Sequence, residues 1–187
     1  MSNPGGFQRI TLAEADAGCI GVYWGTSFIS RLIEWGEGIA KEGYRPPSHA
    51  FMIYDKDTIL EARWPRVALK PKSEYPEDQV AVYRLPGSAL AKRVAINHIA
   101  HQYVNRRYGL IAVSAMAFIE PARALGFNPG NYIADKDEDF CSELATVYLD
   151  LLAETDHDFT VANLGRPACV DPAGLYGWLQ SVEMKAA

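Results

Sequence analysis

The chain of 187 residues lacks several features that mark specialised classes of protein. It has only three cysteines, Cys19, Cys141 and Cys169, and their odd number and wide spacing do not fit a disulfide framework or a zinc knuckle. So few cysteines favour a reducing compartment.

The chain also lacks a basic surplus: 18 Lys and Arg stand against 23 Asp and Glu, a net charge of -5. Because proteins that bind nucleic acid are usually basic, we expect no nucleic-acid partner.

Long apolar runs are also missing. The most apolar stretch, residues 110–119, is too short to span a bilayer, so we expect no integral membrane segment. The first residues, MSNPGGFQRITLAEADAG, lack the basic and apolar regions of a signal peptide. We therefore expect a cytoplasmic protein as synthesised, with lysis or a secretion system needed to deliver it elsewhere. Residues 1–17 are predicted to be a loose leader and residues 18–187 a single domain, and the oligomeric state is left open.

Hydrophobic periodicity predicts an α+β fold. Alternating residues predict strands over 19–24 and 78–86, a hairpin over 48–62 and a proline-flanked edge strand over 65–71. Helical spacing predicts helices over 27–40, from Ser88 to Tyr103, over 137–154 and after Pro172. The expected buried faces of the second and third helices are Leu90, Val94, Ala95, Ile99 and Tyr103, and Leu144, Val147, Tyr148, Leu151 and Leu152.

Cys141 falls in the first turn of the clearest predicted helix, after Asp139 or a neighbour as its N-cap. The free N–H groups and the helix dipole at that position favour a thiolate, and the same N–H groups could hold a developing oxyanion. A histidine beside the thiol would complete an ion pair, and a carboxylate behind the ring would orient it. Taken alone, Cys141 would more often be a small buried hydrophobe.

The hairpin SHAFMIYDKDTILEA offers both missing groups, His49 and Glu61. A two-residue turn at 56–57 pairs 52 with 61 and puts Glu61 on the face opposite His49. A three-residue turn at 55–57 pairs 51 with 61, and Glu61 then lies diagonal to His49 on one face, ~7–8 Å away at the backbone. The sequence alone leaves both turns open. His98 and His101 could touch one metal ion, but without a third ligand they are expected to be surface residues.

The order of strand, helix, "SHA" before a strand, "EA" on the next strand and "FCSEL" at a helix start resembles the circularly permuted papain-like enzymes related to NlpC/P60, closest to the YaeF/YiiX-like branch. The resemblance runs from about Gly18 to Leu179. It implies an antiparallel sheet packed against the helix that bears the nucleophile. It further implies that Cys141 is the nucleophile, His49 the base and Glu61 the third polar residue, and that Tyr108 lines the substrate site.

Together these features predict a cysteine-dependent acyl hydrolase or amidase that forms a thioester and needs no metal or cofactor. The resemblance favours a peptide amide of the bacterial cell wall as substrate. A lipid acyl group, hydrolysed or transferred, is the alternative, which the apolar stretch 110–119 and the tryptophans near the predicted site would suit. A third hypothesis is a silent binding or structural module, against which the complete Cys, His and Glu set argues.

Overall fold

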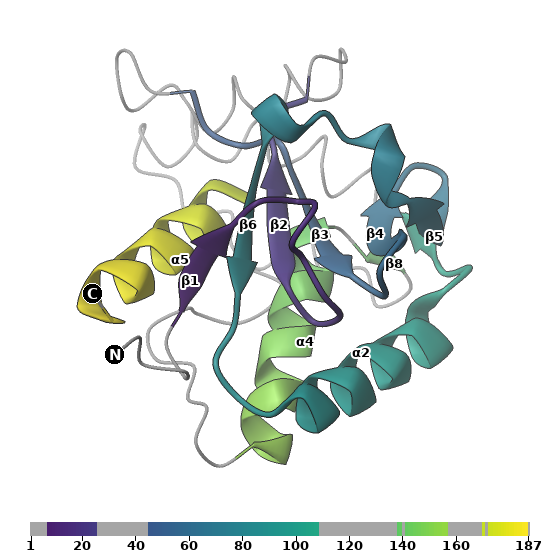
Figure 1. Ribbon diagram of the computed structural model, residues 1–187. Coiled ribbons are helices and arrows are strands. Elements are labelled where there is room, and N and C mark those ends of the chain that lie inside the picture. The colour runs from purple at the N-terminus through teal and green to yellow at the C-terminus, as the bar shows by residue number, and fades with distance from the viewer. Residues whose placement is uncertain are drawn as a thin grey trace, which may run out of the picture.

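The computed structural model of the protein describes residues 7–25, 45–108, 138–139, 141–156, 170 and 172–186. Over these ranges the fold is α+β, as the sequence predicts: a mainly antiparallel sheet carries three helices on one face (Figure 1). The predicted helix over 27–40 and the apolar stretch 110–119 lie outside the described residues. Within the described ranges, no helix is both long enough and apolar enough to cross a membrane.

The strands are β1 (Gln8–Ile10), β2 (Ile20–Tyr23), β3 (His49–Ile53), β4 (Thr58–Arg63), β5 (Arg66–Pro71), β6 (Val80–Arg84), β7 (Arg107–Tyr108) and β8 (Glu138–Asp139). They form one sheet in the order β1-β6-β2-β3-β4-β5-β7-β8, in which only the pair β7–β8 is parallel. The helices are α2 (Ala89–Tyr103), α4 (Cys141–Thr155) and α5 (Pro172–Ala186). Two short 3-10 turns, η1 (Lys72–Glu74) and η2 (Glu77–Gln79), join β5 to β6.

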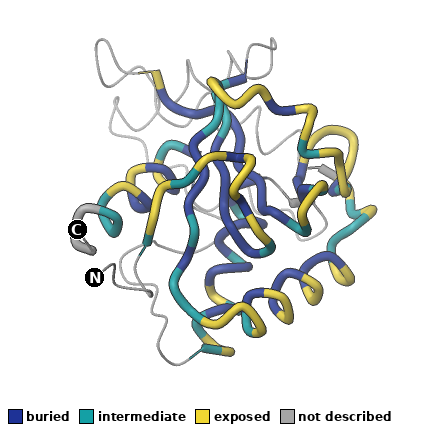
Figure 2. Tube along the Cα trace, viewed as in Figure 1, coloured by how far each residue is buried: buried dark blue, intermediate teal, exposed yellow. Residues whose placement is uncertain are grey.

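Each face of the sheet buries its own core. Alternate residues of the central strands, such as Ala50 and Met52 of β3, join the apolar faces of α2, α4 and α5 in a helix-side core. The residues between them, such as Phe51 and Ile53, pack on the other face in what we call the second core. The second core is Leu12, Ala15, Cys19, Phe51, Ile53, Ile59, Tyr75 and Val82. The central strands are therefore covered on both sides, which is why they are buried along nearly their whole length (Figure 2).

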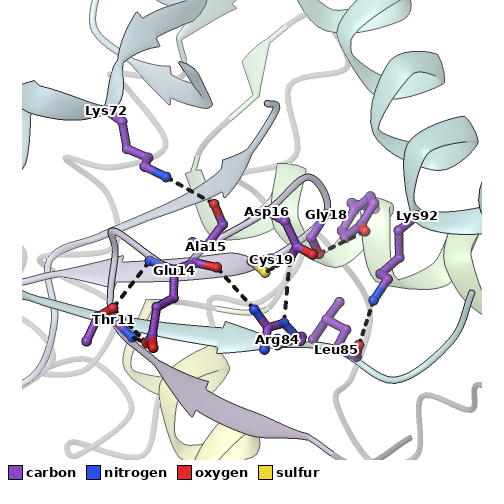
Figure 3. A network of polar contacts seen from close by, with 11 residues as sticks. Thr11, Glu14, Ala15, Asp16, Gly18, Cys19, Lys72, Arg84, Leu85 and Lys92 are labelled. Carbon is purple, nitrogen blue, oxygen red and sulfur yellow. Dashed lines mark hydrogen bonds and ion pairs between the residues drawn. The ribbon is translucent and has the colours of Figure 1, made fainter. Parts of the chain in front are cut away.

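The expected loose leader is wrong over its described residues. β1 pairs with β6, and Leu12 and Ala15 are buried in the second core. Lys72 Nζ donates to the Ala15 carbonyl at 3.0 Å, and Arg84 Nη2 donates to the Glu14 carbonyl at 3.1 Å (Figure 3). Leu12 and Ala15, two apolar residues three positions apart, are too weak a signal to predict an edge strand and a segment that covers one face of the sheet. The boundary expected at residue 18 thus does not separate this segment from the sheet.

Helix α2 begins where it was predicted to begin, but the face that it buries against the sheet is not the predicted one. Ser88 is its N-cap, and the Ser88 hydroxyl accepts a hydrogen bond from Ala91 N at 3.0 Å. Leu90 and Val94, expected to be buried, are 73% and 51% exposed. The buried face is instead Lys92, Ala95, Ile96, Ile99 and Ala100. Lys92 can face inward because its Nζ donates to the Leu85 carbonyl at 3.0 Å while its aliphatic stem packs against the core.

Candidate functional site

The hairpin β3–β4 adopts the three-residue turn. Phe51 pairs with Glu61, and the Asp57 N–H donates to Asp55 Oδ1 at 3.0 Å within the turn. This register confirms the pairing of 51 with 61 that the longer turn predicts, and it places Glu61 on the same face of the sheet as His49. A two-residue turn would have sent the carboxylate to the helix-side core.

Hydrogen bonds before β3 fix where the strand begins. The Ser48 N–H donates to the Tyr23 carbonyl at 3.0 Å, and the buried Ser48 hydroxyl accepts from the Gly25 N–H at 3.0 Å. Because Tyr23 is also the register partner of His49, the end of β2 holds the first residue of β3 in place. His49 is 7% exposed, so its ring is set by the protein rather than by solvent.

The two side chains of the hairpin are in contact. His49 Nε2 lies 2.8 Å from Glu61 Oε2, and Glu61 is 1% exposed. The hydroxyl of Tyr75, a residue between η1 and η2, donates to the same carboxylate oxygen. A carboxylate this deeply buried is tolerated because a cation and a hydroxyl donor both reach it.

The charges of this pair support each other. Burial raises the pKa of Glu61, but the hydrogen bond and the charge of His49, with the Tyr75 hydroxyl, outweigh burial and hold that pKa below its usual range. Burial also disfavours the charged form of His49, and so on its own it would lower the pKa of that ring. The charge and the hydrogen bond of Cys141 oppose it, and together with Glu61 they raise the His49 pKa to about 9. The ring is therefore an imidazolium at neutral pH.

Cys141 is the first residue of α4 and is 3% exposed. Cys141 belongs to the helix-side core, whereas His49 and Glu61 lie on the other face of the sheet. The β3–β4 ladder ends at the pair 51–61, although β3 extends back to His49 and β4 on to Arg63. At this end the register of β3 with β4 does not continue. Helix α4 packs on both strands, and Cys141 at its start lies close enough to His49 to raise the pKa of the ring.

Cys141, His49 and Glu61 are arranged in the order that a nucleophile, a base and an acid that orients the base would have. Because Nε2 of His49 is engaged by Glu61, Nδ1 is the ring nitrogen left for Cys141. The thiol lies at a helix N-terminus, whose unpaired N–H groups and dipole favour negative charge. These groups can form a thiolate and stabilise an oxyanion beside it.

Other predicted residues stand apart or lie partly outside the described structure. The backbone of Tyr108 is in β7 beside Asp139 of β8, which precedes the Cys141 helix, but the Tyr108 side chain lies outside the described residues. Asp139 is in a strand rather than at the N-cap of α4. His98 and His101 are exposed on α2, and Cys169 lies outside the described residues.

Sequence reasoning missed Tyr75. The signal that could have found it is its setting in PKSEYPEDQ, where it is the one aromatic residue of a polar, proline-flanked segment. Such a residue indicates a segment anchored on a core. What Tyr75 touches could not be predicted, because the segment's fold depends on contacts with strands far away in sequence.

Comparisons of the chain with protein-family models and with curated proteins found no match. The geometry of the described residues therefore carries the functional argument.

Proposed function

We propose that this protein is a cysteine-dependent acyl hydrolase with Cys141 as nucleophile, His49 as general base and acid, and Glu61 as the residue that orients His49. One observation carries the proposal: a cysteine at a helix N-terminus lies close enough to a buried histidine to raise its pKa, and that histidine contacts a buried carboxylate at 2.8 Å. A purely structural cysteine has no need of an ion pair.

The reaction follows from these positions. The Cys141 thiolate attacks the substrate carbonyl, and the negative charge that develops on oxygen is stabilised by the backbone N–H groups at the start of α4. The His49 imidazolium then gives its proton to the leaving group as the carbonyl bond to that group breaks, which leaves a thioester on Cys141. His49, now neutral, takes a proton from water as the water oxygen attacks the thioester; the C–S bond then breaks, which releases the acid and regenerates the Cys141 thiolate beside the His49 imidazolium.

We further propose that the fold is of the permuted papain-like kind related to NlpC/P60. The chain order supports this: the strand with His49 and the strand with Glu61 both precede the helix with Cys141, and that helix packs on both strands. The antiparallel sheet with helices on one face agrees with such an arrangement.

The substrate proposed first is a peptide amide of the cell wall. A second candidate, an acyl lipid, has its own observation. Trp64 is 62% exposed at the β4–β5 turn, between the exposed arginines Arg63 and Arg66. Exposed tryptophan beside cationic side chains suits the interface of a lipid surface.

Incubation with purified peptidoglycan and, separately, with phospholipid vesicles, read by mass spectrometry, tests both candidates. The wild type should release new peptide termini or free fatty acid, and the Cys141→Ala variant should release neither. Intact protein stopped in acid should carry the added mass of an acyl group. Equal product with both proteins, or no product from either substrate class with no acyl adduct, would contradict the proposal.

A further inference from the structure

Tyr75 is held against the candidate site from several sides. It is 5% exposed, its ring packs edge-on against Tyr23 with centroids 4.8 Å apart, and it lies 4.8 Å from the Phe51 ring. The Tyr75 and His49 rings are nearly parallel, with 14° between their planes and 6.3 Å between centroids. A side chain packed in this way has little freedom to turn its hydroxyl away from Glu61.

Both donors reach the same oxygen of Glu61. Oε2 accepts from Tyr75 and contacts His49 Nε2, whereas Oε1 is buried and has no hydrogen-bond partner in the part of the chain that the structure describes. With His49 as the single donor, the carboxylate could rotate partway and weaken its contact with the ring. The Tyr75 hydroxyl opposes that rotation, because the oxygen that leaves His49 would also leave Tyr75.

Tyr75 is also a donor that keeps its proton. Burial, and next the charge of Glu61, raise the pKa of the Tyr75 phenol far above its usual range. The hydroxyl therefore stabilises the carboxylate without becoming a second negative charge. The other charged or titratable groups that act on this pair are His49 from β3, Arg63 from β4 and Cys141 from α4.

We propose that Tyr75 is a positioning residue of the Cys141–His49–Glu61 reaction, holding Oε2 of Glu61 against His49 so that the other ring nitrogen faces the thiol. The inference rests on the proposed function and adds a fourth residue that acts through Glu61. The segment 72–79, which joins β5 to β6, would then contribute a residue to the site from the face of the sheet that lies away from the helices.

Tyr75→Phe tests the proposal because the ring and its packing are kept and only the hydroxyl is lost. Since the hydrogen bond that holds the carboxylate against His49 is lost, we expect kcat/KM for p-nitrophenyl acetate to fall about ten-fold or more. Without this donor the Glu61 carboxylate takes up a proton more readily. The acid limb of the pH profile should therefore move to higher pH, both for hydrolysis and for alkylation of Cys141 by iodoacetamide.

Tyr148→Phe is the matched control. Its buried hydroxyl donates to the Gly18 carbonyl at 3.0 Å, far along α4 from Cys141, so the same atom is removed from an equally buried tyrosine. That variant should keep the wild-type pH profile. A double-mutant cycle adds a second criterion: in a Glu61→Gln background, Tyr75→Phe should have little further effect.

The outcomes separate the two proposals. If Cys141 of the wild type reacts no faster than cysteine in the urea-unfolded chain, the proposed function fails and the role of Tyr75 falls with it. If Cys141 is activated but Tyr75→Phe keeps the wild-type rate and profile, only the role of Tyr75 is overturned. A profile shifted equally by Tyr75→Phe and Tyr148→Phe, or additive effects in the cycle, would make Tyr75 a packing residue and also overturn it.

Discussion

Two cysteines of this protein are buried alike and paired differently. Cys19 is 1% exposed and Cys141 is 3% exposed, so burial does not distinguish them. Cys19 lies just before β2, where its Sγ donates to Asp16 Oδ1 at 3.0 Å (Figure 3). Cys141 lies at the start of α4, close enough to His49 to raise the pKa of that ring. One thiol faces a carboxylate and the other faces an imidazolium.

The partner decides the chemistry of each thiol. Burial raises the pKa of Cys19, and the hydrogen bond and the charge of Asp16 add to it, so that this pKa reaches about 12. At neutral pH Cys19 is then held as a thiol. Cys141 lies beside the cationic ring of His49 instead of a carboxylate. The comparison teaches that the reactive cysteine is recognised by the charge next to it and not by its exposure.

The largest effect expected is the loss of activity in Cys141→Ala, since no other group of the described site can form the thioester. Removing one sulfur atom should cost at most ~1–2 kcal/mol of unfolding free energy. Leu144→Ala, one turn further along the same helix, is the contrasting variant. It deletes buried methyl groups, should cost ~2–5 kcal/mol and should keep activity while folded.

Denaturant unfolding and an activity assay on each variant measure both quantities. Cys141→Ala should be stable and inactive, and Leu144→Ala should be less stable and active. If Cys141→Ala keeps activity, or is destabilised as strongly as Leu144→Ala, Cys141 is a packing residue.

The next effect concerns alkylation. Iodoacetamide near neutral pH should modify Cys141 well before Cys19, as peptide mapping by mass spectrometry can show for each site. His49→Ala should slow modification of Cys141 by about ten-fold or more, because the cation that attracts the thiolate is lost, and should leave Cys19 unchanged. Equal modification of both cysteines in the folded protein would remove the distinction between them.

A smaller effect is expected in stability against pH. The His49 pKa is raised from 6.5 to about 9 in the fold, so the stabilisation from its charge is fully present below pH 6.5 and is lost as the pH rises through about 9. The Glu61 pKa is lowered from 4.5, so its contribution is present above pH 4.5 and is lost as the pH falls through the folded pKa. Thermal unfolding should therefore show the highest Tm between about pH 4.5 and 6.5.

The variant His49→Gln should flatten the alkaline side of that curve, because the group that loses its proton there is gone. A wild-type Tm that stays level from pH 6.5 to 9.5 would show that His49 is not held as a cation.

The smallest effect is expected at the other cysteine. In Asp16→Asn the carboxylate beside Cys19 loses its charge, which should lower the pKa of that thiol, but burial, the larger cause, stays. Alkylation of Cys19 near pH 9 should rise by a few-fold at most, and Cys141 should be unaffected. If Asp16→Asn makes Cys19 as reactive as Cys141, the charge of the neighbour alone controls both thiols and burial does not matter.

Sequence reasoning identified the hairpin and its two polar residues because strand alternation and turn residues are local signals. The cap at Ser88 was predicted for the same reason, and so was the helix that carries Cys141, although its start was placed at 137, ahead of the strand β8. It failed for the face of α2, where it took Leu90 and Val94 as buried and left out Lys92. A helix that carries apolar residues on more than one side does not reveal which side meets the sheet.

The sequence by itself determined the local elements of the candidate site: a cysteine at a helix start and a histidine and a glutamate on successive strands. Only the tertiary structure decided that the turn has three residues, that the register of β3 with β4 does not continue to His49, and that α4 delivers Cys141 there. It alone also brought Tyr75 to Glu61. The reason is range: caps, turns and periodicity depend on residues a few positions apart, whereas these contacts join segments that only the packing of the whole sheet brings together.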